Sequence, residues 1–196
     1  VSPQVGAWAA LGAGLKARAS AGTAFRVPTY TELYYTDPQT AGDPGLAPEK
    51  AVNVEAGLAW EKGAISVDAA LFRRDGTDVI DFVRSSPSGP YRATNLRSVD
   101  TTGLEATAAA DLSRLAGTPL ARVVLRAALY HAALAPLPPG TEGRYVLDPL
   151  RFRWDLVAEA LLPFRLDALA RLSYFDRPSF AGPVLLLDAR PSWDAF

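Results

Sequence analysis

Apolar and polar residues alternate with a period of two along much of the sequence. Between residues 15 and 25, Leu15, Ala17 and Phe25 share one face, and Lys16 and Arg18 lie opposite. The same alternation recurs further along the chain, in residues 50–62, 64–74, 104–111 and 151–160. Because successive side chains of a β-strand point to opposite sides of a sheet, this pattern predicts an all-β fold of about eight strands.

Two stretches are also compatible with helices. Residues 103–135 and 154–172 are rich in Ala, Leu and Arg, which favour helix by intrinsic propensity. Composition alone leaves helix and strand open in both stretches. We favour strands because the earlier segments are strand-like in composition as well as in period. Pro163 also falls inside the second stretch, where a hairpin turn would lie.

The connections between the predicted strands differ in length on alternate sides. One set is mostly long and rich in Pro, Gly, Tyr and Ser, at 26–48, 84–90, 133–148 and 176–182. The other set is mostly short, at 61–63, 112–118 and 162–165. Alternate connections of a meander lie at opposite ends of its strands, so one end carries turns and the other carries loops, which is typical of an outer-membrane β-barrel.

These connections predict an antiparallel up-and-down meander. Most of them are too short for crossovers, so we expect each strand to pair with its sequence neighbour and no pair to be parallel. The longest hairpin should join residues 64–83 to residues 91–111, and its loop should lie at the same end as the loop at 26–48.

The two faces of the predicted sheet differ in polarity. The polar face carries Lys16, Arg18, Glu55, Asp68, Arg74, Glu105, Arg126, Arg153, Asp155, Glu159 and Arg171. In a membrane barrel this face lines the lumen and the apolar face meets lipid. Several aromatic residues fall near predicted strand ends, where interfacial girdles lie: Trp60, Phe82, Tyr91, Tyr130, Phe152, Phe164 and Tyr174.

Composition narrows the possible functions. The chain has 196 residues, a formal net charge of −1 and no cysteine. The absence of cysteine excludes thiol catalysis, disulfides and cysteine-based zinc sites. No basic field indicates a nucleic-acid partner. No apolar run reaches the ~20 residues of a transmembrane helix, so a membrane role would require a barrel or a surface contact.

Four motifs resemble a known family. They are "GTAFRVPTYTELYY" at 22–35, "GDPGLAPEKAVNVEAGLAWEKG" at 42–63, "VDAALFRRDGTDVIDFV" at 67–83 and "YRATNLRSVDTTGLEA" at 91–106. In this order and spacing, they are similar to the C-terminal part of the barrel of TonB-dependent outer-membrane receptors, in the vitamin B12 and siderophore branch. Beyond residue 112 only the rhythm of strands and loops supports the resemblance.

The resemblance implies a fold, a function and partners. Residues 1–196 would be a partial barrel domain, an open segment of a transmembrane barrel of about 22 strands. The plug domain, the N-terminal strands and the last strands would lie outside this sequence. The implied function is TonB-dependent uptake of a metal chelate (a siderophore) or a corrinoid across the outer membrane of a Gram-negative bacterium. The implied partners are outer-membrane lipid, the plug and remaining strands of the parent chain, the TonB complex through that plug, and a small iron-chelate or corrinoid ligand.

Candidate ligand-binding residues lie in the predicted external loops. They are Tyr30, Tyr34 and Tyr35 in the first loop, and Arg84, Tyr91 and Arg92 around the tip of the longest hairpin. We expect no catalytic residue, no metal site and no cofactor. His131 is the only histidine, the aspartates match no calcium loop, and Gly12-Ala13-Gly14 is a turn rather than a phosphate-binding loop.

Two alternatives remain at this stage. Eight strands can close, so the chain would then be a complete small outer-membrane barrel with a structural or adhesive role. Otherwise it would be a barrel-borne enzyme or a soluble β domain. Pairing between the first and last strands would favour the closed barrel, and a convergent serine, histidine and carboxylate would favour the enzyme.

Overall fold

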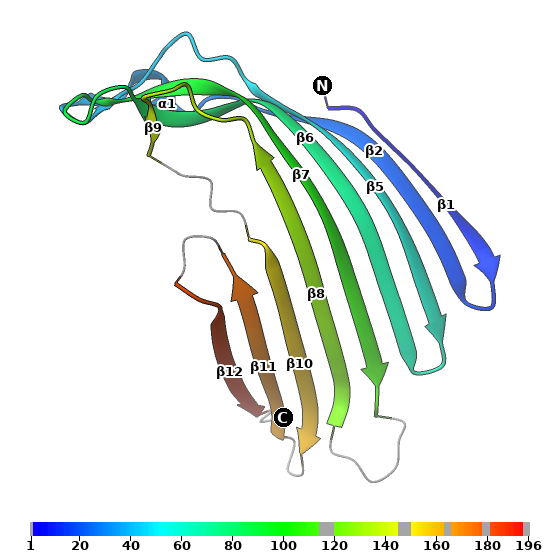
Figure 1. Ribbon diagram of the computed structural model, residues 1–196. Helices are drawn as coiled ribbons and strands as arrows, with labels where there is room; N and C mark the ends of the chain where they lie inside the picture. The colour runs from blue at the N-terminus through cyan, green and yellow to red at the C-terminus, as the bar shows by residue number, and fades with distance from the viewer. Residues whose placement is uncertain (1, 114–119, 145–149, 163–165, 178–180, 194–196) are drawn as a thin grey trace.

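The computed structural model describes residues 2–113, 120–144, 150–162, 166–177 and 181–193, which form one curved sheet and a short helix (Figure 1). The elements are β1 (Gln4–Gly12), β2 (Leu15–Arg26), α1 (Tyr30–Tyr34), β3 (Thr36–Asp37), β4 (Thr40–Ala41), β5 (Glu49–Lys62), β6 (Ile65–Arg84), β7 (Tyr91–Asp111), β8 (Leu120–Leu134), β9 (Glu142–Gly143), β10 (Phe152–Leu162), β11 (Leu166–Asp176) and β12 (Val184–Trp193).

The long strands form a meander. Along the sheet they follow the order β1-β2-β5-β6-β7-β8-β10-β11-β12, and each pairs antiparallel with its neighbour on this path. The strand prediction is therefore confirmed for the described residues of both stretches that are also compatible with helices. β6 and β7 form the longest hairpin, with 20 and 21 residues. Pro163 lies outside the described residues.

The sheet is open. β1 and β12 are its two edges, and they do not pair with each other in the part of the chain that the structure describes. The alternative of a closed eight-stranded barrel is therefore wrong. β1 itself was not predicted, because Val5, Ala7 and Ala9 alternate with Gly6 and Trp8, so neither face is polar. The turn predicted at Gly12-Ala13-Gly14 joins β1 to β2, with Ala13 at a φ of 50°.

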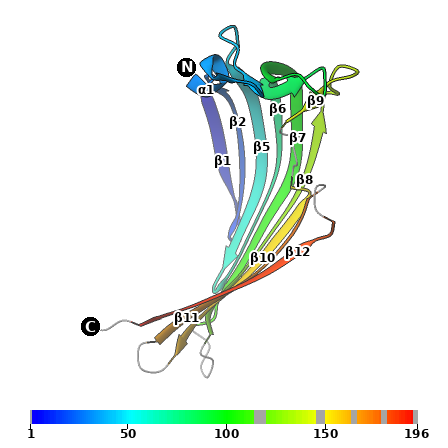
Figure 2. The ribbon, with the colours of Figure 1, turned by 90° about the vertical axis from the view of Figure 1, so that its left-hand side faces the viewer.

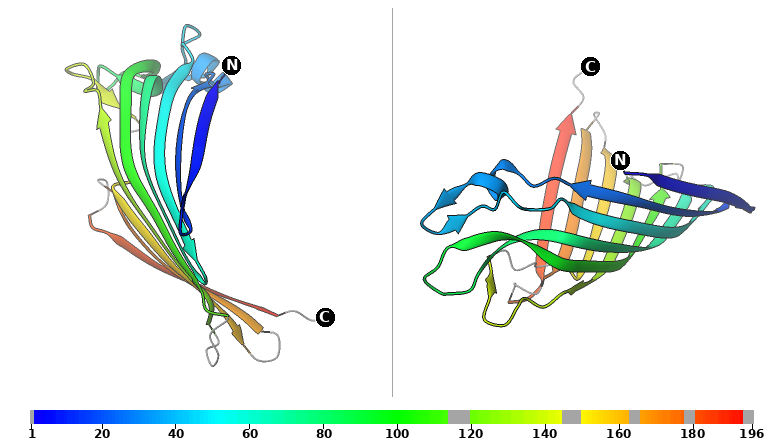
Figure 3. Two further views of the ribbon diagram at one scale, coloured as in Figure 1. Left: turned by 90° about the vertical axis from the view of Figure 1, so that its right-hand side faces the viewer. Right: turned by 90° about the horizontal axis from the view of Figure 1, so that it is seen from above.

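The sheet curves and twists strongly (Figures 2 and 3). Side chains crowd together on the concave side of a curved sheet and splay apart on the convex side, so burial distinguishes the two faces. Val124 and Val157 on the polar face are 4% and 5% exposed. Leu71 and Leu129 on the apolar face are 63% and 50% exposed. The polar face is therefore the concave one.

The register places all the predicted polar-face residues on this concave face. One row across the sheet, which passes through Ala59 on β5, carries polar residues on six other strands: Lys16, Asp68, Thr107, Arg126, Asp155 and Ser173. The rows above and below it on the same face contain Arg18, Glu55, Arg74, Glu105, Arg153, Glu159 and Arg171. This arrangement matches a polar lumen wall.

The convex face carries an apolar band with a sharp upper limit. Leu71, Leu104 and Leu129 form one row across β6, β7 and β8. In the next row towards the loop end, Arg73 and His131 occupy the same face. Polar side chains beyond this row mark the level at which the sheet leaves hydrocarbon.

The aromatic prediction is correct in part. Trp60, Phe152 and Tyr174 lie on the convex face near strand ends, and the Trp154 ring stacks on Tyr174 with a centroid distance of 5.9 Å. Tyr130, in contrast, lies on the concave face and donates a hydrogen bond to Glu105. The position of an aromatic residue near a strand end does not reveal its face. Phe164 lies outside the described residues.

Two further expectations about the connections were wrong. β4 pairs in parallel with β7, where Thr40 faces Tyr91 and Ala41 faces Arg92. β9 pairs with β6, which is not its sequence neighbour. Both short strands belong to long loops that fold back onto the tip of the β6–β7 hairpin, and a loop long enough to fold back can add a strand in either direction.

The convex face yields a test of the facing assignment in the intact parent protein. Leu58 and Val54 are both exposed on the convex side of β5, but the register places Val54 beside Arg73 and Leu58 beside Ala69, deeper in the apolar band. Leu58→Arg should make insertion into the bilayer less favourable by ~2–4 kcal/mol, and Val54→Arg by ~0–1 kcal/mol, because a cation costs more the deeper it lies in the bilayer. A bilayer-refolding titration measures both values. Glu55→Gln on the concave face is the control, and an equal loss in all three variants would reverse the assignment.

Candidate functional site: the external loop cluster

Three connections converge at one end of the sheet. They are the loop between β2 and β5, the tip of the β6–β7 hairpin, and the described part of the connection between β8 and β10 (Figure 3). The predicted candidate residues all lie in the first two connections. Short turns join β1 to β2 and β5 to β6 at the opposite end (Figure 1). The expectation that loops 26–48 and 84–90 share one end is confirmed.

The first loop begins with a single turn of helix. Thr29 is the N-cap of α1: its hydroxyl accepts a hydrogen bond from the Glu32 backbone N–H, and the Glu32 carboxylate accepts one from the Thr29 N–H. This reciprocal pair is a capping box, and Thr-x-x-Glu is its sequence signature. The helix was not predicted, although residues 29–32 carry this signature.

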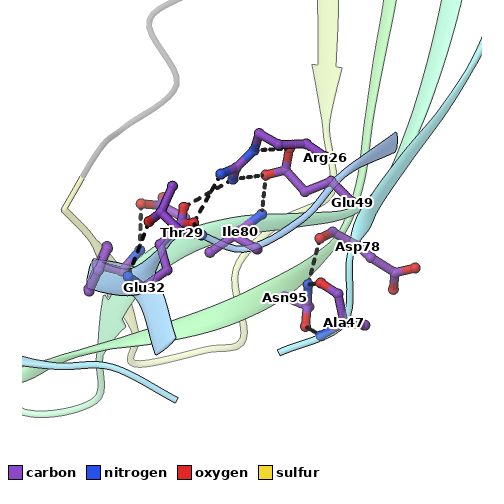
Figure 4. A network of polar contacts seen from close by, with 10 residues as sticks. Arg26, Thr29, Glu32, Ala47, Glu49, Asp78, Ile80 and Asn95 are labelled. Atoms are coloured by element: carbon purple, nitrogen blue, oxygen red, sulfur yellow. Dashed lines mark hydrogen bonds and ion pairs between the residues drawn. The ribbon is translucent and has the colours of Figure 1, made fainter. Parts of the chain in front are cut away.

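Arg26 ties this helix to the sheet (Figure 4). Its guanidinium donates to both carboxylate oxygens of Glu49 at 2.7 and 2.6 Å, and to both oxygens of Glu32 at 2.9 and 3.0 Å. Glu49 in turn accepts from the Ile80 backbone N–H on β6 at 2.8 Å. One arginine at the end of β2 thus joins α1, β5 and β6 through bidentate charge-assisted hydrogen bonds.

Asn95 fixes the far end of the same loop. Its side-chain oxygen accepts from the Ala47 N–H at 2.9 Å, and its amide donates to the Ala47 carbonyl at 3.0 Å and the Asp78 carbonyl at 2.6 Å (Figure 4). Asp78 has a φ of 57° and is missing from the paired residues of β6 and β7, although the register is unchanged on either side of it, where Thr77 faces Ser98 and Val79 faces Leu96. The loop therefore leaves β2 at Arg26 and returns to β5 next to Asn95. We call the polar contacts of Arg26, Glu32, Glu49 and Asn95 the loop latch.

Short strands extend the hairpin into a small external sheet. β4 adds to β7 on one side, and β9 adds to β6 on the other, where Val83 faces Gly143 and Arg84 faces Glu142. The loops at 26–48 and after β8 are therefore held by backbone pairing as well as by side chains. We call the assembly of β3, β4, β7, β6 and β9 the external platform.

Two arginines lie over the ring of Tyr91 on this platform. The Cζ atoms of Arg84 and Arg144 lie 4.7 and 5.6 Å from the ring centroid, within cation–π distance. Arg84 also donates to Glu142, at 2.9 and 2.6 Å. Arg144 donates to the hydroxyl of Thr40 at 2.8 Å. The cluster joins the three connections through side chains.

The structure brings together only some of the predicted candidate residues. Arg84 and Tyr91 meet, but strand alternation directs Arg92 to the other face of β7. Tyr30 and Tyr34 form their own pair on α1, with ring centroids 5.2 Å apart, and are 77% and 56% exposed. Tyr35 donates to Asp37. Arg144 and Thr40 were missed because no sequence signal links residues 104 positions apart.

The electrostatics of the loop latch follow from its hydrogen bonds. Arg26 holds the pKa of Glu49 below its ordinary value, and the Ile80 N–H acts in the same direction. Partial burial acts to raise the pKa of Glu32, but the hydrogen bonds from Arg26 and Thr29 outweigh it, so that pKa is also lowered. Both groups are therefore ionised at neutral pH. Among the described residues, no group of three or more histidine, aspartate or glutamate side chains could hold a metal ion.

Comparison with known proteins decides the family. The family described as "TonB dependent receptor-like, beta-barrel" matches residues 1–180. The chain belongs to the TonB-dependent receptor family. The described helix α1 is too short to span a membrane, and no other described helix does so. Membership of this family places the chain in the outer membrane of a Gram-negative bacterium, in agreement with the apolar convex band.

Individual receptors resemble this chain to different extents. It is 30% identical over 87 residues to the vitamin B12 transporter BtuB of Vibrio vulnificus, an overlap of 44% of the chain and 14% of that protein. It is 31% identical over 97 residues to the BtuB protein of Photobacterium profundum, covering 48% of the chain and 16% of that protein. The siderophore receptor PirA of Pseudomonas aeruginosa shares the fold over 100% of the chain and 33% of that structure, with a TM-score of 0.71 and 16% identity. This chain thus spans about a third of the solved receptor.

Removing the central cation of the loop latch should loosen the first loop of the receptor. Arg26→Gln should cost about 1–2 kcal/mol of local stability, because two carboxylates lose charge-assisted hydrogen bonds. The cost is modest because Arg26 is partly exposed and solvent screens its ion pairs. Hydrogen exchange of residues 29–48 in the parent receptor measures the loss. Arg92→Gln is the control, since the Arg92 side chain makes no hydrogen bond or ion pair with described residues. Equal exchange in the two variants would contradict the latch.

The loop latch should also weaken in acid. Because the pKa values of Glu32 and Glu49 are lowered in the folded protein, their stabilisation is complete above the ordinary value of 4.5 and is lost as the pH falls through the lowered folded values. Two N–H groups report on the latch: Ile80 donates to the Glu49 carboxylate, and Asp43 donates to the Glu32 backbone carbonyl at 2.9 Å. Their protection, corrected for intrinsic exchange rates, should therefore be constant from pH 7 to pH 5 and fall below about pH 4.5. Protection that stays constant to pH 3 would exclude this mechanism.

Proposed function

We propose that this chain forms part of the barrel wall of a receptor for TonB-dependent uptake of a metal chelate or a corrinoid. The observation that carries the proposal is the family match over residues 1–180. Vitamin B12 transporters and siderophore receptors are among the similar proteins, which supports these two ligand classes. The plug, the remaining strands and the TonB complex are the proposed partners of the wall.

We further propose that the external loop cluster meets the ligand. The exposed rings of Tyr30 and Tyr34 offer a surface for stacking. Arg84, Tyr91 and Arg144 offer charge and a ring close by on the platform. Tyr35 is bonded to Asp37, and Arg92 lies on the other face of β7 from Tyr91, so we expect neither side chain to contact the ligand directly. The proposed role is binding and not catalysis.

A binding experiment on the parent receptor tests both parts. Purified receptor is titrated with a panel of ferric chelates and with cobalamin. One class should bind, and Tyr30→Ala with Tyr34→Ala should weaken that binding roughly tenfold through the loss of stacking. Arg92→Ala is the control and should bind as the unaltered receptor does.

The outcomes distinguish an error in the proposed function from an error in the proposed contact surface. If no chelate and no corrinoid binds, the proposed function is wrong. If one class binds equally well to the double tyrosine variant, the function stands and the proposed contact surface is wrong.

A further inference from the structure

The concave face holds a polar cavity far from the external loop cluster. It has a volume of about 320 Å³ and lies over β7, β8, β10 and β11. Its charged and phenolic lining consists of Glu105, Arg126, Tyr130, Arg153, Asp155 and Arg171. These residues come from four neighbouring strands, and their positions on one face follow from the register.

Both carboxylates of this cavity already have partners. Asp155, 7% exposed, accepts hydrogen bonds from Arg153 at 2.6 and 2.9 Å and from the Ser173 hydroxyl. Glu105 accepts from the Tyr130 hydroxyl at 2.8 Å.

Arg126 and Arg171 have no such partner. Asp188 lies opposite Arg171 on β12, but its two oxygens accept hydrogen bonds from Arg190. Arg126 faces Asp155 directly in the register of β8 and β10, yet Asp155 directs its oxygens to Arg153 and Ser173. Within the described residues, neither Arg126 nor Arg171 makes a side-chain hydrogen bond or ion pair. The lining has three arginines (126, 153 and 171) against two carboxylates (105 and 155), a net charge of +1.

The two arginines are placed to act together. They lie on β8 and β11, on either side of β10, and the register offsets them by two residues. Their Cα atoms are therefore separated by about 10 Å across the strands and about 7 Å along them. Both side chains line the same cavity, so a small acidic group in it can contact both guanidiniums.

We propose that Arg126 and Arg171 form a carboxylate-binding site on the concave wall. Paired guanidiniums suit a carboxylate because each presents two parallel N–H donors to its two oxygens. The carboxylate comes either from an acidic side chain of the parent chain outside this structure or from a free anionic solute in the lumen. The site does not depend on which ligand the receptor takes up, so its test is independent of the proposed function.

Chemical modification of the intact parent receptor tests the site. Phenylglyoxal reacts with accessible, unpaired guanidiniums, and peptide mapping by mass spectrometry follows each arginine separately, with and without citrate as the anionic probe. Arg74 is the internal reference, because it lies on the concave face outside the cavity lining and its neighbours across the sheet, Asn53 and Thr101, carry no charge. If an acidic side chain of the parent chain occupies the site, Arg126 and Arg171 should react roughly tenfold more slowly than Arg74 in the absence of citrate. If the site takes a free anion, Arg126 and Arg171 should react as fast as the reference arginine without citrate, and roughly tenfold more slowly than it when citrate is added.

A second measurement separates binding from simple coverage. If the slowing occurs without citrate, Arg126→Gln with Arg171→Gln should lower the thermal unfolding midpoint of the parent receptor, because a carboxylate then loses its partners. Arg74→Gln should leave that midpoint unchanged, and Arg126→Lys with Arg171→Lys should restore part of it. The proposal is overturned if both arginines react as Arg74 does with and without citrate. It is also overturned if they are protected without citrate and the double glutamine variant unfolds at the unaltered temperature.

Discussion

The backbone hydrogen-bond ladder of the antiparallel sheet is the constraint on which the other features depend. In hydrocarbon, each backbone N–H and C=O needs a partner within the protein, and a continuous ladder supplies one. β6 and β7 pair almost throughout, from Ile65 opposite Ala110 to Val83 opposite Arg92. The ladder also sets the direction of each side chain, so a single register assigns the charged residues to the concave wall and the aliphatic residues to the convex one.

Glycines decide where long side chains can cross this concave wall. The Arg18 guanidinium reaches from β2 over Gly57 to Asp68 on β6, and a Cβ atom at Gly57 would lie 2.7 Å from the Arg18 Cζ. The Phe72 ring similarly covers Gly103 on β7 and meets Tyr130 on β8, with ring centroids 5.9 Å apart. Because a missing side chain opens a path across a strand, each of these contacts links three strands. A larger residue at either glycine would displace the crossing side chain.

The external end is built by a different rule. There the β6–β7 hairpin extends beyond the apolar band, and loops from both sides attach to it as short strands. Arg26 and Asn95 hold the first loop at its two ends, and Gly42 lets the helix backbone pack directly onto the chain, since a Cβ there would lie 2.8 Å from the backbone at Leu33. The result is a fixed surface of tyrosines and arginines at the mouth of the wall, where loops positioned by a rigid scaffold commonly carry binding residues.

The sequence by itself determined what depends on neighbouring positions in the chain. Period-two alternation located the long strands other than β1 and sorted Arg18, Glu55 and Asp68 onto one face. The uneven connections identified the loop end, and the motifs identified the family. The capping box at Thr29 and Glu32 was also readable, although it was overlooked. Tertiary structure alone decided the contacts between distant segments. These are the parallel pairing of β4 with β7, the cation–π contact of Arg144 with Tyr91, and the hydrogen bonds that Asp155 accepts from Arg153 rather than from Arg126. The physical reason is that alternation is a property of adjacent residues, whereas these contacts depend on the register and curvature of the whole sheet, which bring together residues from strands and loops far apart in the sequence.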